Sequence, residues 1–254
     1  MLVHGFTDLG FGWHLVAERL AAHGHVIAPD LRGHGDSDWI GPGGYYHFFD
    51  YLADLDDVIA KLARKRVVLV GHSMGGSVCG YYAGMRPDRL TALALLEGLG
   101  PPDQSASPLP SRTVSWIEQW RAARGRVRVM TLDEAIARLR KHDHLLDPDL
   151  ARTLAIAGTR EVPGGLAWKH DPLHVTMGPY PYRLDVAMQF WRNVTCPTLI
   201  VDGAESRLNL PLDERARRRA AFANHRHVVI DGAGHALQRH QPAELARLIA
   251  ALAG

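Results

Sequence analysis

The stretch "VLVGHSMGGS" (residues 68–77) decides the fold of this chain. Its apolar run, Val68–Val70, leads into a G-x-S-x-G motif, Gly71–Gly75, and a helical stretch follows. A serine on a sharp turn between a strand and a helix is forced outward, and the glycines permit a close backbone approach that a Cβ would block. The N-terminus of the following helix favours negative charge that develops beside it. We therefore predict that Ser73 is a nucleophile rather than an incidental turn residue.

Short apolar runs of the same kind recur along the chain, and each ends in a Gly or Asp turn. They are "MLVHG" (1–5), "HVIAPD" (25–30), "RVVLVGHS" (66–73), "LTALALLEG" (90–98), "PTLIVDG" (197–203) and "RHVVIDGAGH" (226–235). Helical patterns separate them, as at residues 13–24 and 51–65. Continuous apolar strands that alternate with helices are typical of a parallel sheet covered by helices on both faces. The sequence therefore predicts an α/β fold.

The alternation of strands and helices stops near Gly100 and resumes near Val194. A Pro- and Ser-rich exit, "GPPDQSASPLPSR", is followed by a mainly helical pattern. We predict a core formed by residues 1–100 and 194–254. Residues 101–193 are predicted to form an inserted helical cap over the carboxyl ends of the strands.

Two helix starts are marked inside the predicted cap. Thr131 and Glu134 form a capping box ahead of an apolar periodicity. Asp147 is an N-cap with Pro148 at the first helical position, and this helix should end at Gly158.

The predicted cap is rich in large apolar side chains. They are Trp116, Trp120, Met130, Trp168, Met177, Tyr180, Tyr182, Met188, Phe190 and Trp191. Such residues either pack the cap onto the core or line an apolar pocket for an acyl or alkyl chain. The sequence leaves both roles open.

Composition argues against several classes of protein. Of 254 residues, 46% are apolar and 22% charged, as in ordinary globular enzymes and unlike disordered chains. The formal charge of +2 favours neither nucleic acid nor a membrane as a partner. No apolar run approaches the ~20 residues needed to span a bilayer. Cys79 and Cys196 lie far apart, without a C-x-x-C motif, which fits a reducing compartment. We predict a cytoplasmic protein.

The chain opens directly on an apolar strand, "MLVHGF" (1–6), with no charged-then-apolar signal segment before it. Either the fold begins abruptly or an N-terminal piece is missing. We expect an exposed sheet edge here, because an unpaired strand leaves its N–H and C=O groups open to pairing.

Four motifs together resemble the α/β-hydrolase family. They are "HGF" (4–6), "DLRGHGDSD" (30–38), "GHSMGG" (71–76) and "GAGHALQRHQPAEL" (232–245). The resemblance covers nearly all of the chain. Within the family, the chain is similar to capped esterases. It implies that the backbone N–H groups of Phe6 and Met74 form an oxyanion hole, in which each donor typically lowers the barrier by ~3 kcal/mol. Epoxide hydrolases and haloalkane dehalogenases of this family use an aspartate nucleophile, so Ser73 argues against both.

A serine hydroxyl needs a neighbouring base to take its proton. His235 is the best candidate of the fifteen histidines, because "GAGH" follows the last apolar strand and its glycines let the ring lean over Ser73. His72 is expected to be structural, since neighbours on a tight turn point apart. His34 is expected to serve packing and turn hydrogen bonds.

Other polar clusters carry a weaker signal. The pairs His23/His25, His142/His144 and His225/His227 lack a third ligand in register, so we expect no metal site. The basic stretch "DERARRRAAF" (213–222) is predicted to be a solvated helix face, since no aromatic residues are interleaved to stack bases.

The acid of the triad is missing from its commonest position. The resemblance to α/β-hydrolases implies an acid three residues after the glycine that ends the fifth strand, and counting from Gly203 gives Ser206. A serine cannot hold an imidazolium ion electrostatically. Neighbouring strands run only ~4.8 Å apart, so the tip of the preceding strand can serve the same histidine.

Glu97, at the end of "LTALALLEG", is therefore the predicted acid. The local sequence resembles a serine-hydrolase-like subfamily in which the later strand also lacks its aspartate, and the extra methylene of glutamate helps it reach across. Glu205 and Asp202 are the alternatives, although Asp202 precedes the turn glycine and should face elsewhere.

These features predict a serine hydrolase that cleaves a small-molecule carboxylic ester with a small or medium acyl chain. Ser73, Glu97 and His235 would form the triad, without metal or organic cofactor. A carbon–carbon bond hydrolase or an acyltransferase would use the same triad. A non-hydrolytic ligand-binding or signalling protein of the same fold is the alternative from another class. No nucleic acid or membrane partner is expected.

Overall fold

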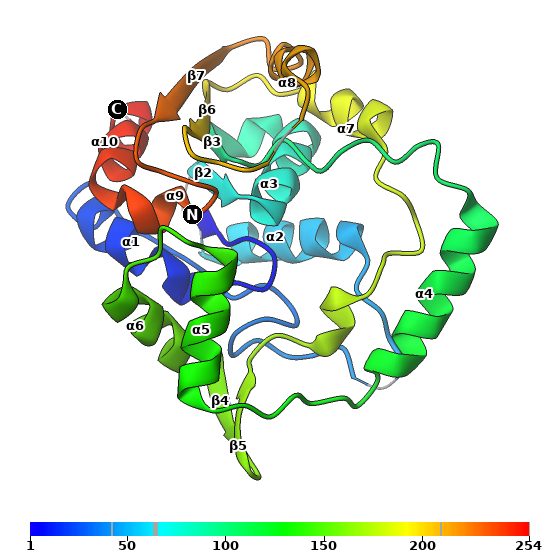
Figure 1. The fold of residues 1–254 in the computed structure, drawn as a ribbon. Coiled ribbons are helices and arrows are strands. Elements are labelled where there is room, and N and C mark those ends of the chain that lie inside the picture. The colour runs from blue at the N-terminus through cyan, green and yellow to red at the C-terminus, as the bar shows by residue number, and fades with distance from the viewer. Residues whose placement is uncertain (42, 63–65, 209, 254) are drawn as a thin grey trace.

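The computed structural model describes residues 1–41, 43–62, 66–208 and 210–253, and it centres on one parallel sheet (Figure 1). Within these ranges the sheet has five strands in the order β1-β2-β3-β6-β7. All four neighbouring pairs are parallel, which confirms the predicted α/β fold. The strands are β1 (Leu2–Val3), β2 (Val67–His72), β3 (Leu90–Leu96), β6 (Thr198–Gly203) and β7 (His225–Ile230).

The predicted strand at residues 25–30 is wrong. These residues form no regular strand, and the Leu2 N–H donates to the Ile27 carbonyl over 2.8 Å. Pro29 has no N–H to offer to a ladder, and the Asp30 carboxylate accepts hydrogen bonds from loop amides instead. This hydrogen bond occupies part of the edge of β1, so the segment partly covers the edge that was expected to be exposed.

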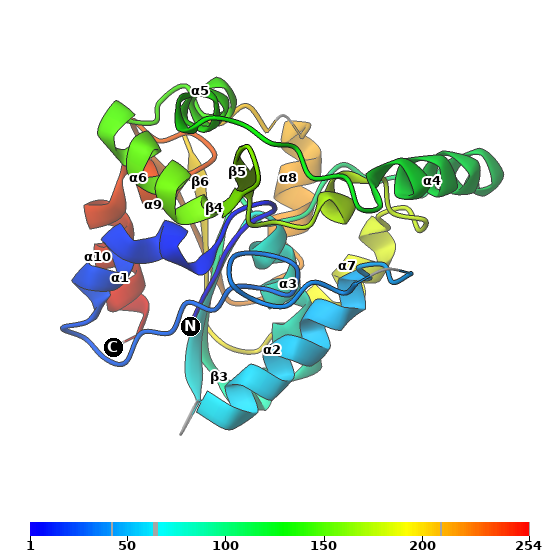
Figure 2. The ribbon, with the colours of Figure 1, turned by 90° about the horizontal axis from the view of Figure 1, so that it is seen from below.

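Helices cover both faces of the sheet (Figure 2). One core cluster packs between the sheet and α2, α3 and α7, and a second packs between the sheet and α1 and α10. The helices are α1 (His14–Leu20), α2 (Phe48–Leu62), α3 (Met74–Met85), α7 (Leu184–Trp191), α8 (Leu212–Arg219), α9 (Leu237–His240) and α10 (Pro242–Ala253), with short 3-10 turns η1 (Gly10–Trp13) and η2 (Pro87–Arg89). The last three residues of the helix predicted at 51–65 lie outside the described residues.

The segment predicted as a cap contains several helices. They are α4 (Leu109–Ala123), α5 (Leu132–His142) and α6 (Pro148–Gly158), followed by the hairpin of β4 (Thr159–Val162) and β5 (Gly165–Trp168), the 3-10 turn η3 (Pro172–Val175) and then α7. Figure 1 shows α4 standing apart from α5 and α6. Both predicted helix starts are confirmed, with the capping box of Thr131 and Glu134 and the Asp147 cap in place. The hairpin was not predicted. That residues 101–193 act as one cap stays a prediction, and within them α7 contributes Leu184, Ala187 and Trp191 to the main core.

No helix among the described residues combines the length and the apolar character that a membrane crossing requires.

One arginine of the basic stretch is buried. Arg218 is 0% exposed, and its guanidinium donates to the carbonyls of Leu99 (2.6 Å) and Gly100 (3.0 Å) and to the Glu214 carboxylate (3.1 Å). The prediction of a solvated helix face is therefore wrong at this position. Arg218 instead fixes the chain where it leaves β3, directly after Glu97.

Replacing Arg218 with Met should therefore destabilise the fold. The change leaves two buried carbonyls and Glu214 without their donor, which typically costs about 3–5 kcal/mol when one partner of a buried pair is removed. Urea unfolding should show this loss for Arg218→Met, whereas Arg217→Met, an exposed neighbour on α8, should change stability by about 0.5 kcal/mol or less. Equal stabilities of the two variants would contradict the role of Arg218.

Candidate active site

Ser73 lies on a strained turn between β2 and α3. Its φ of 53° and ψ of −119° lie outside the regions that a non-glycine residue normally adopts, and such a conformation costs on the order of 1–3 kcal/mol. A Cβ at Gly71 would lie 2.4 Å from the Gly75 carbonyl, and a Cβ at Gly75 would lie 2.4 Å from the carbonyls of Val3 and His4. The turn can be this tight only because both flanking residues are glycine.

Two backbone amides beside Ser73 are free to donate. No residue in the described part of the chain accepts a hydrogen bond from the N–H of Phe6 or Met74. Met74 is the first residue of α3, and amides of a first helical turn have no partner within their helix. Thr7, with φ of 55°, donates its N–H to His34 Nε2 over 3.3 Å. The turn at residues 5–7 is thus held by side chains while the Phe6 amide stays open.

Two neutral histidines support this turn. His4 Nε2 accepts from the Leu31 N–H over 2.9 Å, so its Nδ1–H donates to the Gly5 carbonyl over 2.8 Å. His34 accepts from Thr7, so its Nδ1–H donates to the Arg32 carbonyl over 3.1 Å. Burial lowers the pKa of His4, and burial together with the neighbouring imidazoles lowers the pKa of His34 to about 2. Both rings therefore remain neutral and keep the lone pair that their acceptor role needs.

His235 lies on the loop between β7 and α9, and its backbone is fixed to the serine turn. The His235 carbonyl accepts from His72 Nε2 over 2.8 Å, and the two ring centroids are 4.7 Å apart. Burial lowers the pKa of His72 to about 3, and the nearby His235 acts in the same direction. His72 is therefore a neutral donor that holds the histidine loop, in agreement with its predicted structural role.

The same loop is also connected to the predicted cap. The Gly234 N–H donates to His240 Nδ1 over 3.1 Å, and His240 Nε2 donates to the Asp143 carboxylate over 2.8 Å. Arg239 lies between two carboxylates, 2.9 Å from Asp8 and 3.9 Å from Asp143. Burial is the largest influence on Asp8 and opposes its ionisation, but the Arg239 guanidinium, the nearby His4 and His72 and the Leu9 N–H together outweigh it, so the pKa of Asp8 is lowered. The loop after β7 is thus held on one side by the core and on the other by the end of α5.

Glu97 is the carboxylate that the structure places beside His235. Its Oε2 lies 3.6 Å from His235 Nδ1, and this ring nitrogen has no hydrogen-bond partner among the described residues. Glu97 Oε1 accepts from the Gly203 N–H over 2.9 Å, and Oε2 accepts from the Ser206 hydroxyl over 2.8 Å. The side chain is only 6% exposed, while that of His235 is 39% exposed. Both oxygens of a nearly buried carboxylate are therefore bound by the end of β6.

The alternative acids face elsewhere. The Asp202 carboxylate lies 2.8 Å from His227 Nε2 and 3.8 Å from the Arg219 guanidinium. Glu205 is exposed, and the carboxylate that pairs with His235 among the described residues is that of Glu97. The structure thus brings Glu97, and neither alternative, to His235. Sequence reasoning treated Ser206 only as a missing acid and did not predict that it binds Glu97.

Side chains of the types that bind metal ions do not cluster in the described part of the chain. No group of three or more His, Cys, Asp or Glu side chains there is arranged to hold a metal ion. Cys79 and Cys196 are both buried free thiols. Burial raises the pKa of both thiols. Neither cysteine is therefore disposed to act as a thiolate nucleophile.

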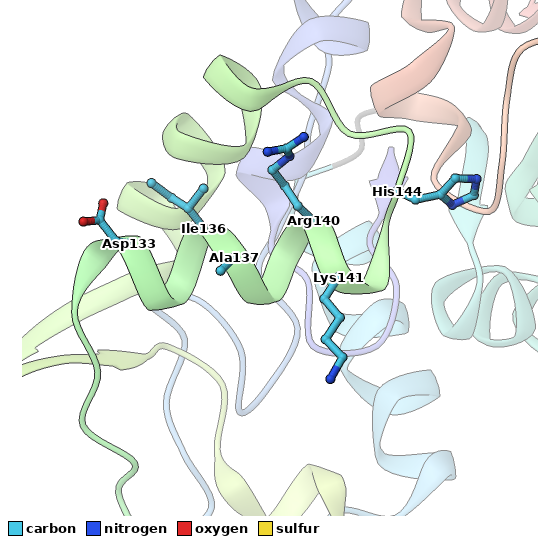
Figure 3. Close-up of a pocket in the computed structure, with 6 residues that line it drawn as sticks. All are labelled: Asp133, Ile136, Ala137, Arg140, Lys141 and His144. Atoms are coloured by element: carbon cyan, nitrogen blue, oxygen red, sulfur yellow. The ribbon is translucent and has the colours of Figure 1, made fainter.

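A groove of about 580 Å³ runs along α5, apart from these residues (Figure 3). Figure 3 shows that its lining comes from α5 and the loop directly after it. The lining residues are Asp133, Ile136, Ala137, Arg140, Lys141 and His144. Ser73, Glu97 and His235 do not line this groove.

Comparison with known proteins agrees with the observed fold. Residues 1–248 match the model of the alpha/beta hydrolase family. The chain belongs to the alpha/beta hydrolase family.

Individual relatives of this alpha/beta hydrolase carry hydrolase names. A serine hydrolase-like protein of Danio rerio is 28% identical over 183 residues, which cover 67% of this chain and 54% of that protein. A 3-hydroxybutyrate-oligomer hydrolase of Cupriavidus necator is 29% identical over 262 residues, covering 96% of this chain and 84% of that protein. The solved thioesterase domain from the curacin biosynthetic pathway superposes with a TM-score of 0.87 at 28% identity, over 98% of this chain and 89% of that domain. The chain thus spans about half the length of the Danio rerio relative.

The neutral state of His72 makes the stability of this alpha/beta hydrolase sensitive to acid. An unfolded histidine binds a proton near pH 6.5, whereas folded His72 does so only near pH 3. Between these values the unfolded state binds more protons, so stability falls as the pH drops, by at most about 1.4 kcal/mol per pH unit from this group. In urea unfolding between pH 7 and pH 4.5, His72→Gln should flatten the pH dependence.

The exposed His23 provides the matched control, and His23→Gln should leave the pH dependence of unfolding unchanged. An unaltered slope in His72→Gln would show that His72 is not the buried neutral donor described above.

Proposed function

We propose that this hydrolase cleaves carboxylic esters of small or medium acyl chain through an acyl-enzyme intermediate. The observation that carries the proposal is the position of the Glu97 carboxylate, fixed on both oxygens and 3.6 Å from His235 Nδ1. A carboxylate behind an imidazole, near a serine on a strand-to-helix turn, is the arrangement that activates a serine hydroxyl.

In the proposed reaction Ser73 Oγ attacks the ester carbonyl while His235 Nε2 accepts its proton. Glu97 holds the ring in the Nδ1–H tautomer and stabilises the imidazolium ion that forms. The N–H groups of Phe6 and Met74 donate to the oxyanion of the tetrahedral intermediate. His235 returns the proton to the leaving alcohol, and water then attacks the acyl-serine with His235 again as base. The products are a carboxylic acid and an alcohol, and the reaction requires no metal or organic cofactor.

The separation between Glu97 and His235 supports a role that develops during the reaction. At 3.6 Å the two atoms are slightly beyond hydrogen-bonding distance. Catalytic hydrogen bonds are often long before substrate binds and tighten in the complex. Positive charge on the His235 ring would attract the carboxylate and shorten this contact.

We propose further that residues 101–193 act as a cap that bounds the acyl site. Contacts with the loop after residue 30 support this. Asp171 accepts from the Tyr46 hydroxyl over 2.8 Å and donates its N–H to the Gly33 carbonyl over 2.8 Å. His174 stacks on Tyr46 with ring centroids 3.9 Å apart and meets Phe6 edge-on at 6.3 Å. The cap therefore reaches the turn that offers the Phe6 amide.

The names of the relatives support acyl transfer to water. The Cupriavidus necator protein is named a hydrolase of 3-hydroxybutyrate oligomers, and the curacin domain is named a thioesterase. An ester is the simplest acyl substrate that the same triad would cleave.

The placement of the acid can be tested with two matched variants, Glu97→Gln and Glu205→Gln, on a p-nitrophenyl ester of a short acid. Glu97→Gln should lose on the order of 10²–10⁴ in kcat, because an amide favours the wrong imidazole tautomer and cannot stabilise the imidazolium ion. Glu205→Gln should remain within about tenfold of wild type. KM should change little, since the carboxylate does not touch the ground-state substrate.

Ser73→Ala sets the background rate in this assay, since it removes only one hydroxyl from a half-buried turn. Wild-type rates in Ser73→Ala would end the proposal of a serine hydrolase. Loss of activity in Glu205→Gln, with an active Glu97→Gln, would move the acid to the end of β6.

A further inference from the structure

We propose that Ser206 is a positioning residue that aims the Glu97 carboxylate at His235, an inference that rests on the proposed serine-hydrolase function. The Ser206 hydroxyl lies 2.8 Å from Glu97 Oε2, the same oxygen that lies 3.6 Å from His235 Nδ1. An ionised carboxylate only accepts hydrogen bonds, so the hydroxyl must be the donor. Ser206 thus acts through Glu97 and does not touch the reacting atoms.

The direction of the hydroxyl is set by the backbone around it. The Leu208 N–H donates to Ser206 Oγ over 3.3 Å, which leaves the hydroxyl proton free for Glu97. The Ser206 N–H donates to the Gly203 carbonyl over 3.1 Å, so the turn after β6 is closed. Gly203 itself binds the other carboxylate oxygen through its N–H. One short turn therefore supplies both donors to Glu97.

A glutamate needs this support more than a shorter acid would. Its side chain has three rotatable bonds, and fixing such a side chain costs up to about 2 kcal/mol in rotamer freedom. Two donors from β6 hold a carboxylate that comes from β3, with one bond to each oxygen. The remaining lone pair of Oε2 is left for the imidazole.

The neutrality of Ser206 is part of the arrangement. An aspartate at this position would bring a second carboxylate close to Glu97, and two like charges at hydrogen-bonding distance favour retention of a proton on one of them. The same aspartate would meet no such charge once Glu97 is replaced by glutamine. Whether Ser206→Asp raises or lowers kcat should therefore depend on the residue at position 97.

Steady-state kinetics on the short-chain ester provide the first test. Ser206→Ala should lower kcat about ten- to hundredfold with little change in KM, the loss expected for one hydrogen bond to a charged group. Ser206→Thr, which keeps the hydroxyl, should recover most of the rate. In the Glu97→Gln background Ser206→Ala should cost less than about threefold, because the carboxylate it serves is gone.

The aspartate variant tests the charge argument. Ser206→Asp should lower kcat in the wild-type background at neutral pH and raise it in the Glu97→Gln background. A distant hydroxyl, Ser111 on α4, serves as the control, and Ser111→Ala should leave kcat unchanged. Additive losses from Ser206→Ala and Glu97→Gln, or a wild-type kcat in Ser206→Ala, would overturn the proposal.

A readout without substrate separates this inference from the proposed function. The ring ¹⁵N resonances of His235, followed by NMR at constant pH, should shift in Glu97→Gln and move in the same direction, by a smaller amount, in Ser206→Ala. The resonances of His227, which pairs with Asp202, should stay in place. A His235 resonance unmoved by Ser206→Ala would refute the positioning role even if ester hydrolysis is confirmed. If Ser73-dependent hydrolysis fails instead, the resonances still decide whether Ser206 orients the pair.

Discussion

The site depends on a carboxylate that belongs to one strand and is held by the next. Glu97 follows β3, yet the hydrogen bonds to its oxygens come from Gly203 and Ser206 at the end of β6. The parallel register makes this possible, since Leu96 pairs with Val201 and the Glu97 N–H donates to the Val201 carbonyl over 2.9 Å. Any shift between these two strands would separate the carboxylate from its donors.

Two further parts of the site are held by imidazoles that stay neutral. His72 fixes the carbonyl of His235, and His34 fixes the turn that exposes the Phe6 amide. Burial lowers the pKa of both rings, so both stay neutral and keep these hydrogen bonds at neutral pH. Two imidazoles that stay neutral therefore support the loop of His235 and the turn of Phe6.

Much of this arrangement was predictable from the sequence, because apolar runs that end in glycine place Ser73, Glu97 and His235 at the same edge of a parallel sheet. What sequence reasoning missed depends on three-dimensional partners. The burial of Arg218 requires carbonyls more than a hundred residues away, and the binding of Glu97 by Ser206 joins two strand ends. The segment at 25–30 has the composition of a strand, but its proline and its engaged aspartate prevent a regular ladder.

The most direct test of the account is covalent labelling of the purified protein with a fluorophosphonate, followed by peptide mapping and by the rate of labelling. The account predicts a single adduct, on Ser73, and a labelling rate that falls at least about tenfold in Glu97→Gln, because the nucleophile loses its oriented base. An adduct on another residue, no adduct, or equal rates in the two proteins would contradict a serine activated through His235 and Glu97.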